Sequence, residues 1–123
     1  MNIEVSIGEI VDKLSILQIK LENIEDNTKL VNIKKEFEYL EKIVFDDLSM
    51  ERDDYEMLLD INKKLWVIED DIRDKERNSE FDNIFIELAR SVYFTNDKRS
   101  QIKKEINTKY GSDFVEEKSY QEY

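Results

Sequence analysis

Charged and amide side chains that interrupt an apolar helical stripe are the residues of this chain best placed to do chemistry. Asn96 and Arg99 break the apolar stripe of the last long helical segment, and Lys103 continues the same face with Asp97 beside it. A buried asparagine costs stability unless it is hydrogen-bonded, fixes a register or binds something. The interruption therefore indicates a polar site on the inner face of this segment.

Two other segments carry polar groups beside their apolar positions. Glu69 and Arg73 lie on one face, and Lys13 and Lys20, seven residues apart, share another. Arginine and lysine that converge in a cleft between helices bind a carboxylate or a phosphate. The predicted ligand-binding set is Lys13, Lys20, Glu69, Arg73, Asn96, Asp97, Arg99 and Lys103. The competing interpretation is a margin of ordinary salt bridges, with Glu69 and Arg73 as an i,i+4 pair.

Paired carboxylates allow a second kind of site. Glu9 with Asp12, and Glu38 with Glu41, each lie three residues apart on one helical face and could share a magnesium ion. All-α nucleotide pyrophosphohydrolases use such pairs, but their doubled glutamate is absent here. With 30 acidic residues such pairs arise by chance, so we expect no resident metal or cofactor.

Composition excludes several classes of function. The chain has no histidine and no cysteine, which excludes imidazole catalysis, disulfides and the usual zinc, copper and di-iron ligand sets. A formal charge of −11 disfavours nonspecific binding to nucleic acid or to an anionic membrane. No apolar run approaches the roughly 18 residues of a membrane span. We therefore expect a cytoplasmic protein.

The elements that must position these residues are helices. The chain has no proline and two glycines, too few for the turns of a sheet. Apolar residues recur at three–four spacing in four segments, which predicts a four-helix bundle of two antiparallel hairpins. The first three helices should span about Ser6 to Glu25, Lys29 to Phe45 and Glu51 to Arg77, and the fourth, after the Asn78–Ser79 turn, should end near Lys109.

Residues 1–110 should form this bundle domain, and residues 111–123 an acidic tail that can dock on it. The last two helices are longer than the first two, so part of their apolar surface lies beyond the shorter pair. This mismatch predicts a homodimer.

Four phrases of the sequence resemble a family of small uncharacterised all-helical bacterial and bacteriophage proteins. They are Val5–Leu14, Leu65–Arg73, Leu88–Tyr93 with Thr95–Asp97, and Gly111–Asp113 leading to Glu116–Tyr120. The resemblance covers nearly the whole chain and implies no catalytic residues. In some relatives a similar segment stands beside glycosyltransferase-like regions, which implies an accessory role in sugar transfer.

Together these observations favour a non-enzymatic helical module with a polar, partly basic cleft for a small anionic ligand or a partner protein. Two enzymes remain as alternatives. One is a magnesium-dependent hydrolase of phosphorylated compounds that uses Glu9, Asp12, Glu38 and Glu41. The other is a cofactor-free enzyme that holds a dianion with arginine and lysine, as helical chorismate mutases do.

Overall fold

The computed structural model describes residues 1–123, and every regular element in it is helical. The elements are α1 (Ile7–Asn23), α2 (Asn27–Lys42), a π-helical turn (Ile43–Asp47), α3 (Arg52–Arg77) and α4 (Asn83–Lys109). Helices α3 and α4 have 26 and 27 residues, against 17 and 16 for α1 and α2. The predicted all-helical fold with a longer second pair is confirmed. None of these helices is long and apolar enough to cross a membrane.

Side-chain caps fix where three of the helices begin. Ser6 accepts a hydrogen bond from the Glu9 amide at 3.2 Å, as the capping-box pattern predicts. Asp26 caps α2, which begins at Asn27, two residues before the predicted start at Lys29. The difference arises because the Asp26 carboxylate accepts from two amides of the first turn, and a carboxylate there also suits the helix dipole.

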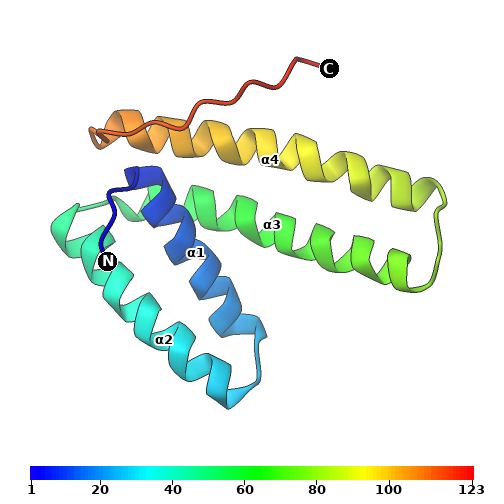
Figure 1. Cartoon of the computed structure of the whole chain (residues 1–123), viewed down its shortest axis with the longest axis horizontal. Coiled ribbons are helices and arrows are strands. Elements are labelled where there is room, and N and C mark those ends of the chain that lie inside the picture. The colour runs from blue at the N-terminus through cyan, green and yellow to red at the C-terminus, as the bar shows by residue number, and fades with distance from the viewer.

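The four helices form two hairpins, and α1 is the central element. The α1–α2 hairpin lies obliquely across one half of the α3–α4 hairpin, and the other half extends past it (Figure 1). Helix α1 packs against each of the other three helices, while α2 packs mainly against α1. Consequently α2 contains no fully buried residue, and the core lies around α1.

The core cluster joins α1, α3, α4 and the π-helical turn through apolar side chains and one buried tyrosine, and Phe37 and Leu40 of α2 pack against it. Tyr55 packs edge-to-face against Phe45, with ring centroids 5.2 Å apart, and its hydroxyl donates to Gln18. Burying a side chain of this size contributes about 1.5–3 kcal/mol once its polar tip has a partner. The nine core residues are Val11, Leu14, Ile19, Val44, Met50, Tyr55, Leu58, Leu59 and Ile106.

The start of α1 is hydrogen-bonded to the last turn of α4 and to the segment that follows α4. The Gly8 amide donates to Asn107 Oδ1 at 2.6 Å, and the Ile7 amide donates to Ser112 Oγ at 3.0 Å. A Cβ at Gly8 would lie 2.9 Å from the carbonyl oxygen of Lys103, so only glycine allows this approach. The contact fixes the rotation of α1 and turns Glu9 and Asp12 toward α4.

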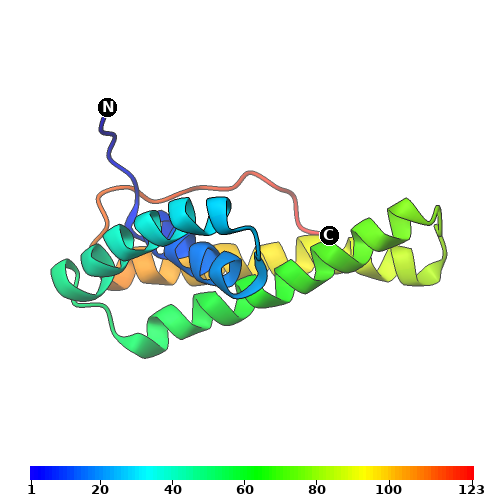
Figure 2. The same cartoon turned by 90° about the horizontal axis from the view of Figure 1, so that it is seen from below.

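The segment after Gly111 is extended and runs back along α4 (Figures 1 and 2). The Gly111 backbone has φ +68°, a left-handed conformation that reverses the chain at the end of the helix. Glu117 then pairs with Lys104 at 3.5 Å, and the Tyr123 ring packs against Phe94 with centroids 4.8 Å apart. We call residues 112–123 the C-terminal tail.

Candidate functional site

A buried carboxylate, Asp12, lies at the centre of the polar residues between the helices. The Asp12 residue is 4% exposed. Arg99 of α4 donates to both of its carboxylate oxygens, with Nε 3.1 Å from Oδ1 and Nη2 2.7 Å from Oδ2. This two-point geometry gives the strongest ion pairs in proteins, because two charge-assisted hydrogen bonds act together. Arg99 thereby points inward, toward α1.

Helix α3 completes this network through Asn62. The Asn62 amide donates to Asp12 Oδ1 at 2.8 Å and to Ser15 Oγ at 2.7 Å, and Ser15 Oγ donates to the Asp12 carbonyl at 2.7 Å. No buried side-chain nitrogen or oxygen in the chain lacks a partner. Desolvation lowers the pKa of Arg99, but the hydrogen bonds and charge of Asp12 outweigh it and raise the pKa overall. We call Asp12, Ser15, Asn62 and Arg99 the Asp12 network.

Lys103 lies one turn further along α4 and is only 8% exposed. Its ammonium pairs with Glu9 of α1 and lies 3.9 Å from Asp12 Oδ2. A third carboxylate, Glu116 Oε2, approaches from the C-terminal tail at 3.5 Å. An ammonium has three donors, so the carboxylate supplied by the tail complements the two supplied by the bundle.

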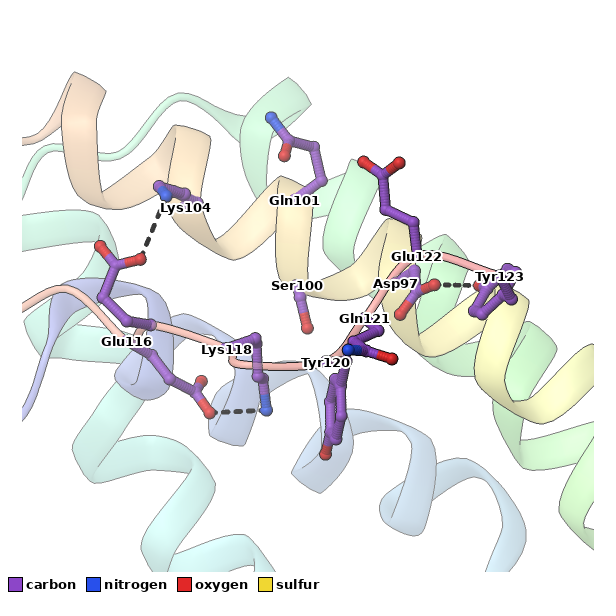
Figure 3. Close-up of a pocket in the computed structure, with 11 residues that line it drawn as sticks. Asp97, Ser100, Gln101, Lys104, Glu116, Lys118, Tyr120, Gln121, Glu122 and Tyr123 are labelled. Atoms are coloured by element: carbon purple, nitrogen blue, oxygen red, sulfur yellow. Dashed lines mark hydrogen bonds and ion pairs between the residues drawn. The ribbon is translucent and has the colours of Figure 1, made fainter.

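A hollow of about 340 Å³ opens above these two cations, between α1, α4 and the C-terminal tail. A second hollow of about 580 Å³ continues along α4 beside the tail (Figure 3). The first hollow, which we call the polar hollow, is lined by Glu9, Asn96, Asp97, Arg99, Ser100, Lys103, Glu116, Lys118 and Tyr120. Its lining contains three cations, three carboxylates and one aromatic ring, a set suited to a small polar ligand.

The tail contributes every second residue to the polar hollow. Glu116, Lys118 and Tyr120 line it and leave the tail on one side in Figure 3, while Glu117 turns away to Lys104. This period of two is that of an extended chain. A hydrogen bond from Lys118, 2.7 Å away, lowers the pKa of Glu116 against the opposing effect of burial, and the charge of Lys103 lowers it further.

The structure brings together half of the residues that the sequence singled out. Asn96, Asp97, Arg99 and Lys103 line the polar hollow. Lys13, Lys20, Glu69 and Arg73 do not line it. Lys13 turns outward to Glu36 of α2 at 3.4 Å, and Arg73 pairs with Glu69 at 3.5 Å on an exposed face of α3, as the salt-bridge interpretation expected for that pair.

Sequence reasoning missed the acidic partners of the two cations. Asp12 and Glu9 were considered only as a metal pair, and Asn62 and Glu116 were not considered as site residues. One signal was present, because Asp12 lies between Val11 and Leu14 of the core stripe. A carboxylate at a core position needs a buried cation as its partner.

The carboxylates of the magnesium alternative do not gather in one place. No group of three or more acidic side chains is close enough to hold a metal ion. Both oxygens of Asp12 already accept from Arg99, and Glu38 and Glu41 line a different hollow beside Arg52. The arrangement at Asp12 is suited to ion pairing between helices.

Fold and site define a class: an all-helical protein of two crossed hairpins with a buried ion-pair network under a polar hollow. The chain belongs to the family of unknown function DUF6165, whose profile matches residues 1–123. Searches of curated proteins and of solved structures found no significant match.

Proposed function

We propose that this protein is a helical binding module that holds a small ligand with a carboxylate or phosphate group in the polar hollow. The main support for this proposal is the position of Lys103. Its ammonium is nearly buried at the floor of the hollow, and the only partner it has outside the bundle comes from the extended tail. A desolvated cation with an exchangeable partner binds anions more strongly than a cation in water does.

The other lining residues would orient such a ligand. Lys118 supplies a second cation near the rim, and Asn96 and Ser100 supply uncharged hydrogen-bonding groups. Arg99 would act on the ligand mainly through its positive charge, because two of its hydrogen-bond donors are already used by Asp12. An accessory role in glycosyl transfer, which the family resemblance implies, stays a prediction, and so does a partner protein.

Titration calorimetry with inorganic phosphate and with citrate tests the proposal. We expect Lys103→Gln to weaken binding by about tenfold or more, because a charge-assisted hydrogen bond contributes about 1.5–3 kcal/mol. Lys98→Gln is the matched control: it removes one positive charge from an exposed position of α4 outside the hollow. Lys103→Arg keeps the charge and should retain most of the affinity.

Equal affinities of the Lys103→Gln and Lys98→Gln proteins, or no binding of either anion to the parent chain, would overturn the proposed function. Far-UV circular dichroism establishes that each variant keeps its helices. A thermal-shift screen of sugar phosphates, nucleotides and carboxylates then identifies the preferred ligand.

A further inference from the structure

The C-terminal tail presents its own anion to the polar hollow. Glu116 Oε2 lies 3.5 Å from the Lys103 ammonium, and the Glu116 side chain remains 43% exposed. Alternate tail residues face the same hollow, so the segment lies there as an extended peptide would. The tail is therefore already placed as an occupant of the site.

The tail is held by contacts that individually contribute little. The pair of Glu117 with Lys104 is 3.5 Å long and largely exposed, and the Tyr120 and Tyr123 side chains are mostly exposed. Each exposed ion pair changes an equilibrium constant by about fivefold at most. Such a segment can leave the hollow without disturbing the core, because none of the residues 112–123 is fully buried.

The bundle keeps Lys103 paired when the tail leaves. Glu9 and Asp12 come from α1, which is fixed to α4 by the Gly8–Asn107 hydrogen bond. Only the position of the Glu116 carboxylate becomes free. An incoming carboxylate or phosphate oxygen can take that position and meet the donor that Glu116 had used.

From these contacts we propose that Glu116 is an internal surrogate for the ligand's anionic group, and that the tail competes with the ligand for Lys103. The inference rests on the proposed function and adds two things to it. It places the anionic group of the ligand at the Glu116 carboxylate, and it makes the affinity of the site depend on release of the tail.

Two tail variants separate this competition from a general charge effect. Glu116→Gln removes the competing carboxylate, and Glu117→Gln removes one carboxylate that pairs with Lys104 outside the polar hollow. We expect Glu116→Gln to bind inorganic phosphate about two- to fivefold more tightly than the parent chain, the factor that we expect from an ion pair whose carboxylate is 43% exposed. Glu117→Gln should change the affinity by a smaller factor.

Limited trypsin digestion supplies an independent measurement on the unmodified chain. If phosphate displaces the tail, added phosphate should accelerate cleavage after Lys118. Cleavage after Arg77, the last residue of α3, should keep its rate, because Arg77 does not line either hollow beside the tail. Mass spectrometry of the fragments follows both sites in one sample.

The outcomes distinguish the two proposals. Phosphate that binds the parent chain, but binds Glu116→Gln no more tightly, overturns the surrogate role and leaves the binding site standing. Slower cleavage after Lys118 in phosphate also overturns it, because the tail would then close over the ligand. Absence of binding to the parent chain overturns the binding function, and the surrogate role with it.

Discussion

Two consecutive residues of α1, Asp12 and Lys13, lie in opposite environments, the first in the interior and the second at the surface. Asp12 is buried against Arg99, while the next residue, Lys13, points outward to Glu36. Successive residues of an α-helix are rotated by about 100°, so neighbours in sequence can face opposite environments. The Asp12 network therefore connects three helices in one specific arrangement, because a buried charge is stable only beside a partner of opposite charge.

Removing the Asp12 carboxylate should be costly. Asp12→Ala removes the carboxylate that pairs with the Arg99 guanidinium and accepts from the Asn62 amide, and we expect a loss of about 3 kcal/mol in the free energy of unfolding. Asp60→Ala, on an exposed face of α3, should change it by less than about 0.5 kcal/mol. Denaturant unfolding followed by circular dichroism compares the two. Similar losses in both variants would show that the network has no structural role.

Between elements, the close contact of α1 with α4 depends on Gly8, which has no side chain. Gly8 lies against the backbone of Lys103 and the Asn107 amide, and this approach places Glu9 beside Lys103. The acidic residues of α1 therefore reach the cations of α4 only if the two helix ends meet closely. A wider separation would leave Lys103 dependent on the tail alone.

Gly8→Ala should separate these two helix ends. Its Cβ would lie 2.9 Å from the Lys103 carbonyl oxygen, and backbone cannot move aside as a flexible side chain can. We expect a loss of about 1–3 kcal/mol and shifted amide resonances at Lys103 and Asn107. In Gly111→Ala the added methyl meets nothing within 4 Å, so its strain at φ +68° stays local and those two resonances should not move. Unchanged resonances in Gly8→Ala would contradict the contact.

For the whole molecule, stability should be uneven along the α3–α4 hairpin. The end of this hairpin near α1 packs into the core, but no residue between Ile68 and Thr95 is fully buried. The other half extends past α1 (Figure 1), and several of its apolar side chains are exposed. The apolar residues of this half that are more than half exposed are Val67, Phe81, Ile84 and Ile86. This exposed surface is what the predicted homodimer would cover.

Amide hydrogen exchange at two protein concentrations tests both points. In dilute solution residues 69–94 should exchange faster than the core segments 11–19 and 55–65, because few apolar contacts hold the hairpin tip. At high concentration exchange of 69–94 should slow if a second copy covers it. Sedimentation equilibrium then gives a mass above the 14.8 kDa of one chain. Exchange independent of concentration, with a mass of one chain, would exclude the homodimer.

The sequence by itself determined the helices and pointed to two of the three cations that line the polar hollow, Arg99 and Lys103. Apolar spacing, the Ser6 cap and the absence of proline depend on neighbours within one or two turns, so local physics predicts four helices, two of them longer. The break at Asn96 and Arg99 pointed correctly to a polar face of α4. Periodicity defines which residues share a face, and it does so without knowledge of the rest of the fold.

The tertiary structure alone decided which faces meet. Asp12 and Arg99 are 87 positions apart, and no local pattern relates them. Their pairing follows from the rotation of α1, which the Gly8–Asn107 contact fixes, and from the oblique angle at which the start of α1 meets the end of α4 (Figure 1). The same rotation turns Lys13 outward, and the reversal at Gly111 brings Glu116 to Lys103. Contacts between distant segments depend on how whole helices pack, which is a property of the folded molecule.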